Sequence, residues 1–382
     1  MSIKKTIIAL SLSSIFITAC GSGSNSSSKT IEPEPIGFNY DATELITNLT
    51  NDVIVVGYQA LDDKAQVFHL ATLSLLNNPT QENLLAAQIA WQEVRVPWEQ
   101  GEAHIFGPVD ALSIDPHLDT WPLNTSDLQA LLTTQSGFSA DELMTWNDDV
   151  QGFHTMEYLL FGDGIESNEK LIEQLTVLEQ EYLVACAEVF KGYTHSLYTA
   201  WTVSLDPNDS STTPYKDLLL TADNDVYASQ LGVIEELING MIGIVDEVGN
   251  GKIADPFATS ISTADTSLVE SQYSWNSLAD FSNNIKGVQN VYRGEFSEQA
   301  DKTGLIDFVH AANATIATRI DDEISAAIIA INTIAGDNNT PFRQAILDEQ
   351  GRERIQLAID SLSVLQTSLE NDVLPLLNEW NH

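Results

Sequence analysis

His154 and Glu157 are the residues whose types and spacing could most directly support chemistry. They lie three positions apart, so a helix would present the imidazole and the carboxylate on one face. Such a pair could share a metal ion with ligands from neighbouring helices of a bundle. A structural hydrogen bond between the two side chains explains the spacing equally well, and on spacing alone it is the favoured interpretation.

Hydrolytic chemistry has less support from the motifs. A catalytic zinc ion needs about three protein ligands, an open position for water and a nearby base. The chain contains no HExxH run, and Tyr158 follows Glu157 where the inverted form of that motif requires a second histidine. The Gly-x-Ser-x-Gly elbow of serine hydrolases is absent as well.

One predicted helix carries a polar stripe, formed by Glu270, Ser274, Ser277 and Asn284 at offsets of four, seven and fourteen residues. A stripe of this kind usually faces water, which is the favoured interpretation. Hydroxyl groups are less typical of a solvated face in so acidic a chain. The stripe could therefore line an internal polar cleft against the helix of His154.

The chain is strongly acidic, with 16 Lys and Arg residues against 55 Asp and Glu residues and a formal net charge of −39. Nucleic acid and anionic lipid are therefore poor partners. Such a surface attracts cations loosely everywhere, so an acidic group alone is weak support for a metal site. Among the few basic residues, Arg95 and Arg293 could each hold an acid or an anionic group by a bidentate pair, and structural ion pairing is the favoured role.

Long amphipathic helices are expected to position these residues. Apolar residues recur every three or four positions over residues 45–60, 84–98, 171–197, 227–245 and 305–331, and alternating strand patterns are nearly absent. Ser139 with Glu142 predicts a capping box, and Ser167 is expected to precede the longest helix. The sequence therefore predicts an all-α protein built of antiparallel helical bundles.

A polar, proline-bounded stretch at residues 204–214 is the expected domain boundary. It would separate an N-terminal bundle over residues 39–205 from a C-terminal bundle over residues 214–382. Hydrophobic residues make up 43% of the chain, which is enough for two cores. Cys186 lies on the apolar stripe of the longest helix and is predicted to be buried rather than nucleophilic.

The N-terminus has the features of a lipoprotein signal peptide. Lys4 and Lys5 precede an apolar stretch that is too short to span a bilayer, and residues 17–20 read Ile-Thr-Ala-Cys, which matches a lipobox. We expect removal of residues 1–19, a lipid anchor at Cys20 and a flexible tether over residues 20–38. Gly21 stands where an aspartate would favour the inner membrane, so we expect attachment to the outer membrane, on its periplasmic or its outer face.

Three ordered blocks of the sequence resemble the imelysin-like family. Residues 152–157, Gly-Phe-His-Thr-Met-Glu, resemble its GxHxxE signature, and residues 91–108 and 270–294 resemble two further blocks. The resemblance spans nearly all of the chain after the tether. It implies a two-domain helical fold with the His–Glu motif near the domain junction, and an envelope protein associated with iron uptake or regulation. The family is also catalogued among the metallopeptidases.

With this resemblance, three functions stay open. The first is a binding protein that holds iron, favoured over zinc, or an iron-bearing ligand, in partnership with an iron-transport protein. His154 and Glu157 would then be ligands, with Glu102 third, although a solvated role for Glu102 is equally supported. The second is a metallopeptidase with Glu157 or Glu102 as base, and the third is a metal-free protein-interaction module. Further residues predicted to line the site are Glu93, Arg95, His104, Asp110, Glu270, Ser274, Ser277 and Arg293.

Overall fold

The computed structural model describes residues 37–207, 209–296 and 302–381. The predicted signal peptide and Cys20 lie outside the described residues. Within them, β-type pairing is limited to two isolated bridges, between Phe38 and Trp380 and between Asp206 and Asp209. The prediction of an all-α fold is therefore confirmed.

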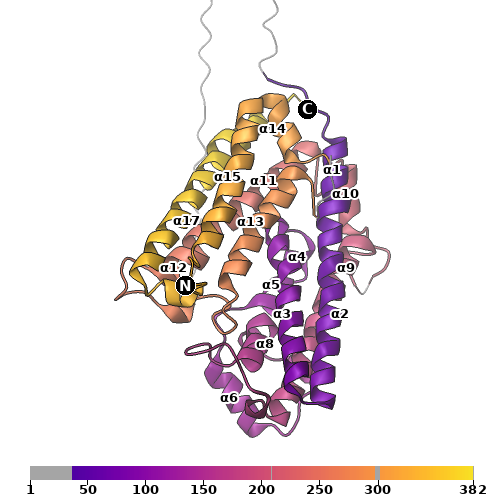
Figure 1. The fold of residues 1–382 in the computed structure, drawn as a ribbon. Coiled ribbons are helices and arrows are strands. Elements are labelled where there is room, and N and C mark those ends of the chain that lie inside the picture. Colours follow the sequence, from indigo (N-terminus) through magenta and orange to yellow (C-terminus); the bar gives the residue numbers. More distant parts are fainter. Residues whose placement is uncertain (1–36, 208, 297–301, 382) are drawn as a thin grey trace, which may run out of the picture. The chain divides into compact units, whose positions relative to one another are not determined.

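Three long helices from the first half of the chain pack together (Figure 1). Helix α2 (Val56–Asn77) contacts both α3 (Gln81–Gly101) and α9 (Val177–Thr202). Each helix turns its apolar residues into a shared core, as the spacing of three and four predicts. This group supplies one wall of the candidate site, through α3.

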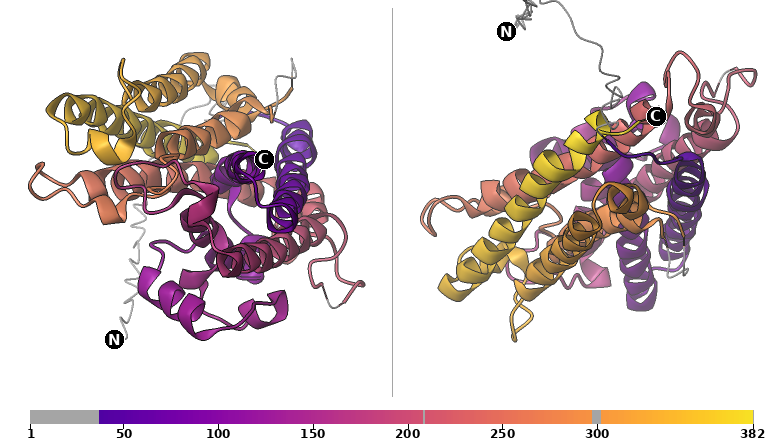
Figure 2. Two further views of the ribbon diagram at one scale, coloured as in Figure 1. Left: turned by 60° about the horizontal axis from the view of Figure 1, so that its bottom comes forward. Right: turned by 90° about the horizontal axis from the view of Figure 1, so that it is seen from above.

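Four helices from the second half supply the opposite wall. They are α11 (Gln230–Asp246), α13 (Ser277–Arg293), α15 (Ala314–Thr333) and α17 (Glu349–Ser368). Helix α13 packs against α15, and α15 packs against α17. The last two, orange and yellow, run side by side in the right-hand view of Figure 2.

Shorter elements connect the long helices, and several of them carry residues of the candidate site. Among these are the 3₁₀ helix η2 (Glu102–His104), α5 (Ile114–Asp119), α8 (Gly152–Phe161) and the π-helical segment η5 (Glu247–Ala254). The other short helices are α1 (Thr43–Asn48), η1 (Leu49–Val55), α4 (Pro108–Ala111), α6 (Thr125–Thr134), α7 (Ala140–Leu143), η3 (Asp148–Val150), η4 (Ile172–Gln174), α10 (Tyr215–Thr221), α12 (Asp255–Phe257), η6 (Thr266–Leu268), α14 (Leu305–Ala312), α16 (Phe342–Ala345), η7 (Leu369–Val373) and η8 (Leu374–Asn378).

The two walls meet where α3 crosses α13, and Gly287 makes the close approach possible. A Cβ atom at Gly287 would lie 2.2 Å from the backbone oxygen of Gln100, far inside van der Waals contact. The crossing is held from the side by Gln100, whose Nε2 donates to Asn283 Oδ1 at 2.8 Å. Only a glycine therefore permits this spacing between the helices that carry the site.

Replacing Gly287 by alanine is expected to destabilise the fold, although alanine is the better helix former. The clash with Gln100 must push α3 and α13 apart, and overpacking of this kind costs about 1–3 kcal/mol. Gly192 in α9 is the matched control, because a Cβ there meets no atom within 4 Å. Gly192→Ala should be neutral or stabilising in urea denaturation, and equal stability of the two variants would contradict this account of the crossing.

Some predicted helix boundaries are wrong. Helix α9 begins at Val177, after a capping box between Thr176 and Glu179, rather than after Ser167. The stripe over residues 305–331 is divided at Asn313, whose side chain caps α15. The polar residues 270–276 precede α13 and form turns, so they do not share its helical face.

The described residues from 37 onward form one compact unit. Helices from both predicted bundles pack directly on each other, as α3 does on α13. The division at residues 204–214 stays a prediction. In the part of the chain that the structure describes, the helices lack the length and apolar content needed to cross a bilayer.

Candidate functional site

Buried charged side chains gather where α3 packs against α13. They come from α3, η2, α5, α8, η5, α13 and the turn before α13, and the exposed fraction of each side chain is 8% or less. We call them the charged cluster. Its members are Arg95, Glu99, Glu102, Asp119, His154, Glu157, Lys252, Glu270 and Asp280.

Gly152 brings the helix of His154 against α5. Its φ of +73° lies in the left-handed region, and a Cβ atom there would stand 2.5 Å from the carbonyl oxygen of Leu118. This contact sets the start of α8 beside the end of α5, where Asp119 is located. The close packing of α8 against α5 thus explains why the GxHxxE signature has a glycine at this position in this chain.

His154 lies between two carboxylates. Its Nε2 is 3.1 Å from Asp119 Oδ1, and its Nδ1 is 2.9 Å from Glu157 Oε2. Burial alone would lower the pKa of His154, but its close contacts with the two carboxylates and their charges raise it to about 9. In the absence of another cation the imidazole is therefore protonated at neutral pH.

Glu157 has both oxygens occupied. While Oε2 faces His154, Oε1 accepts hydrogen bonds from the backbone N–H groups of Tyr273 and Ser274, at 3.0 and 2.7 Å, and from Ser274 Oγ at 2.7 Å. This carboxylate is therefore held in place by the turn before α13. Its role in this geometry is to orient His154 so that Nε2 faces Asp119.

Arg95 is fully buried and surrounded by acids. Its guanidinium lies 2.7 Å from Asp119, 2.8 Å from Glu270 and 3.3 Å from Asp280, and it also contacts Glu99. Burial opposes its charge, but these carboxylates raise the pKa of Arg95 well above its ordinary value. One permanent cation thus holds side chains from α3, α5, α13 and the turn before α13.

Lys252 is the second permanent cation. Its Nζ lies 2.9 Å from Glu102, 3.3 Å from Glu270 and 3.4 Å from Glu99. Asn284 Nδ2 donates to Glu99 Oε2 at 2.6 Å and to Glu102 Oε2 at 2.8 Å. Lys252 therefore connects the acids of α3 and η2 with those near His154.

The acids of the charged cluster differ in how readily they ionise. Burial raises the pKa of Glu99 well above its ordinary value, and burial raises that of Glu102 to about 8 although Lys252 opposes the rise. Burial also favours the neutral forms of Asp119 and Glu270, but nearby cations lower both pKa values, Arg95 most at Asp119 and Lys252 most at Glu270. Asp119 and Glu270 are therefore the acids most able to offer ionised oxygen ligands.

Two groups of three side chains among the described residues could hold a metal ion, with ligand atoms within 4.8 Å of one another. One is Asp119, His154 and Glu270, and the other is Glu99, Glu102 and Asp119. In the first group, His154 Nε2 and Glu270 Oε2 are buried atoms with ion-pair contacts but no hydrogen bond among the described residues. A cation bound between these two incompletely satisfied atoms would give each of them a partner.

Several residues predicted for the site lie in or beside the charged cluster. His154, Glu157, Glu102, Arg95 and Glu270 are members of it. Ser274 holds Glu157, as described above, and the buried Ser277 donates through Oγ to the backbone oxygen of Glu270 at 2.6 Å.

The other predicted lining residues lie outside the charged cluster. Glu93 is about half exposed and pairs with Lys64, and Asp110 is exposed. Arg293 pairs with Asp321, at 2.6 Å. His104 is buried beside Tyr58, whose hydroxyl lies 3.3 Å from its Nδ1, and burial lowers its pKa to about 4.

Sequence reasoning missed Glu99, Asp119, Lys252 and Asp280 as members. Glu99 follows Arg95 by four residues, so helical periodicity could have placed both on one face. Asp280 stands between Ser277 and Asn284 on the polar face of α13. The sequence around Asp119 and Lys252 carries no comparable signal, since each belongs to a separate short element.

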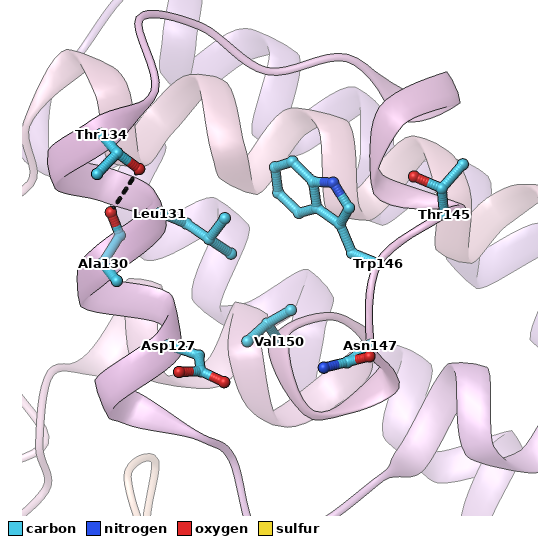
Figure 3. A pocket seen from close by; sticks show the side chains of 8 residues that line it. All are labelled: Asp127, Ala130, Leu131, Thr134, Thr145, Trp146, Asn147 and Val150. Carbon is cyan, nitrogen blue, oxygen red and sulfur yellow. Dashed lines mark hydrogen bonds between the residues drawn. The ribbon is translucent and has the colours of Figure 1, made fainter.

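Two other features have no contact with the charged cluster. Cys186 is buried, as predicted, and burial raises the pKa of its thiol far above the ordinary value. A cavity of about 390 Å³ lies between α6 and residues 145–150 (Figure 3). It is lined by Asp127, Ala130, Leu131, Thr134, Thr145, Trp146, Asn147 and Val150.

Comparisons with known proteins show what the chain is similar to. Residues 54–369 match the model of the imelysin family. The chain is 28% identical over 340 residues to "Iron-regulated protein A" of Synechococcus elongatus, and the match covers 87% of each protein. The predicted resemblance is confirmed by this match to the family model.

Two solved structures are similar over most of their length. A protein from Parabacteroides distasonis, assigned as an iron-regulated protein A precursor, has a TM-score of 0.75 and 27% identity, over 88% of this chain and 94% of that one. An imelysin-like protein from Psychrobacter arcticum has a TM-score of 0.69 and 15% identity, over 90% and 98%. The second likeness concerns the fold alone.

Proposed function

The chain belongs to the imelysin family, and from this premise we propose that it binds a metal ion in the charged cluster, iron in preference to zinc, for iron uptake at the cell envelope. The ion is the cargo of the protein. Asp119, His154 and Glu270 would be its ligands, because their ligand atoms lie together and include buried atoms without hydrogen bonds.

The observation that carries this proposal is the charge imbalance of the charged cluster. Six carboxylates, those of Glu99, Glu102, Asp119, Glu157, Glu270 and Asp280, are buried with three groups that can be cationic, those of Arg95, Lys252 and His154. Buried charge without compensation is costly, so the excess must be met by protons or by a further cation. Because burial raises the pKa values of Glu99 and Glu102, protons on these two groups can meet part of the excess of three negative charges, and a further cation can meet the rest.

The donor set suits iron. One imidazole nitrogen with carboxylate oxygens binds iron in either oxidation state and also binds zinc. Glu157 would act through His154, since a carboxylate on the far ring nitrogen fixes the orientation of a ligating imidazole and raises its basicity. The names of two relatives refer to iron regulation, which favours iron over zinc as the cargo.

Burial favours binding over peptide hydrolysis. The side chains of Asp119, His154 and Glu270 are 1–6% exposed, so a peptide bond has no path to an ion held by them. A catalytic zinc ion needs an open position that water and substrate can both reach. Both oxygens of Glu157 are already hydrogen-bonded, which does not favour a role as catalytic base.

The proposal also includes attachment of the protein to the cell envelope. A lipid anchor at Cys20 and a tether would hold the domain near a transport partner in the outer membrane and raise its effective concentration there. Labelling cells with a radioactive fatty acid tests this, and a Cys20→Ala variant that still carries label would contradict it.

Metal analysis and calorimetry of the purified protein test the proposal. We expect about one ion per chain after iron loading, and binding weakened about 10–100-fold by Glu157→Gln, which removes the charged partner of His154. Glu93→Gln is the matched control, because Glu93 precedes Arg95 on α3 but pairs with Lys64 outside the cluster. Wild-type protein that retains no stoichiometric metal after iron or zinc loading would contradict the proposed function.

A further inference from the structure

A second cavity adjoins the charged cluster, and its acidic lining raises the question of how an ion would reach the buried ligands. It has a volume of about 330 Å³ and lies between η2, α11 and η5. Three of its lining residues are Glu102, Glu236 and Glu247. None of the described residues that line it is basic.

Glu102 belongs to both the cavity and the charged cluster. It is 7% exposed, and its Oε2 accepts hydrogen bonds from Lys252 at 2.9 Å and from Asn284 at 2.8 Å. Its Oε1 accepts no hydrogen bond from the described residues. Glu102 is therefore a nearly buried carboxylate with one unused oxygen, located between the cavity and the charged cluster. Lys252, which contacts Glu102, also contacts the proposed ligand Glu270.

The size and charge of the cavity indicate what it can admit. A cavity needs roughly 10–15 Å³ of such space to hold one water, so about 330 Å³ has ample room for a cation with its water shell. Pockets for drug-sized ligands run from about 300 to 1,000 Å³, so a large organic chelate would fill or exceed this one. The carboxylates attract a bare hydrated cation and repel an anionic iron chelate.

We propose that this cavity is the entry route for a hydrated divalent cation, which Glu102 passes to Asp119, His154 and Glu270. The inference rests on the proposed function and narrows it, because the ion then enters as a hydrated divalent cation and not within an organic chelate. Glu102 swings its unused oxygen toward the ion, and Lys252 gives up its contact with Glu102 as the ion moves inward.

Gly243 offers a way to close the route without disturbing the cluster. It lies on α11, lines the cavity, and a Cβ atom added there meets no atom within 4 Å. Gly243→Leu should therefore fill the cavity while the fold stays intact. Gly192→Leu is the matched control, an exposed glycine inside α9 that also has no atom within 4 Å.

The test is stopped-flow mixing of the purified protein with Fe²⁺ under anaerobic conditions, followed by tryptophan fluorescence. Trp98 donates to Asp119 Oδ2 at 2.6 Å, so an ion bound at Asp119 should quench it. We expect Gly243→Leu to slow association and dissociation of the ion at least about tenfold each, because a blocked route slows both directions, and to leave the dissociation constant within about twofold. Gly192→Leu should behave as the wild type.

A charge variant tests the same route independently. Glu247→Gln should lower the association rate and its dependence on ionic strength, whereas Glu235→Gln, on an exposed residue of α11 outside the cavity, should not. If Gly243→Leu still binds the ion and does so with wild-type association and dissociation rates, the entry route is overturned but the proposed function is not. A larger dissociation constant with an unchanged association rate in Gly243→Leu would also overturn the entry route. Absence of binding in the wild type would overturn the proposed function and the route together.

Discussion

Replacing Arg95 by methionine is expected to lower the free energy of unfolding by about 3–5 kcal/mol, the range found when one partner of a buried ion pair is removed. The methionine fills similar space but leaves Asp119, Glu270, Asp280 and Glu99 without their shared cation. These side chains have little access to water, because Glu99, Glu270 and Asp280 are buried and the side chain of Asp119 is only 6% exposed. Urea denaturation followed by circular dichroism measures the effect.

A surface arginine provides the control for this prediction. Arg319 pairs with Asp372 at 2.7 Å, but its side chain is 42% exposed, so Arg319→Met should cost no more than about 1 kcal/mol. Arg95→Lys should lie between the two, because it keeps the charge and loses the planar fork that reaches several carboxylates. A loss for Arg95→Met as small as that for Arg319→Met would show that the charged cluster does not depend on this cation.

His154→Ala is expected to reduce metal affinity by more than the roughly 10–100-fold typical of a residue that only supports a ligand. The change removes the proposed nitrogen ligand and leaves Glu157 fixed by the turn before α13. Calorimetric titration with Fe²⁺ in anaerobic buffer should show no stoichiometric binding in this variant. Thermal unfolding of the variant establishes whether the fold persists.

His195 is the matched control for His154. It also pairs with an acid, Asp62, at 3.0 Å, but its side chain is 66% exposed and lies outside the charged cluster. His195→Ala should bind metal with wild-type affinity and stoichiometry. If His154→Ala folds and still binds one ion with wild-type affinity, His154 is not a ligand.

The all-α class of the fold and the pairing of His154 with Glu157 could be predicted from the sequence, since both depend on the local spacing of residues. The apolar period of three to four residues gives the long helices directly. The separation of His154 and Glu157 by three residues correctly predicts that both project from one face of α8, where they are hydrogen-bonded. Spacing could not reveal that backbone N–H groups hold the second oxygen of Glu157, because that contact joins residues more than 110 positions apart.

The lining residues show how sequence neighbours differ from neighbours in space. At about 100° per residue, Glu93 is turned roughly 200° away from Arg95 on α3, whereas Glu99 is only about 40° away. The prediction included Glu93, and the helix places it at the surface beside Lys64. A stricter use of the helical period would have found Glu99, and equally Asp280 on α13.

Asp119 and Lys252 could not be found in that way. Each lies on a short element, α5 or η5, whose position depends on long-range packing. The approach of α8 to α5 depends on the contact of Gly152 with Leu118, and that of α13 to α3 on the contact of Gly287 with Gln100. The members of a cluster assembled by such long-range contacts can be identified only from the three-dimensional structure.

The central claim is that an ion lies between Asp119, His154 and Glu270, and anomalous diffraction tests it most directly. Crystals of the protein soaked anaerobically in Fe²⁺ would be measured on both sides of the iron absorption edge. We predict one strong anomalous peak in contact with His154 Nε2 and with carboxylate oxygens of Asp119 and Glu270. Peaks confined to surface carboxylates, with none in the charged cluster, would contradict the claim.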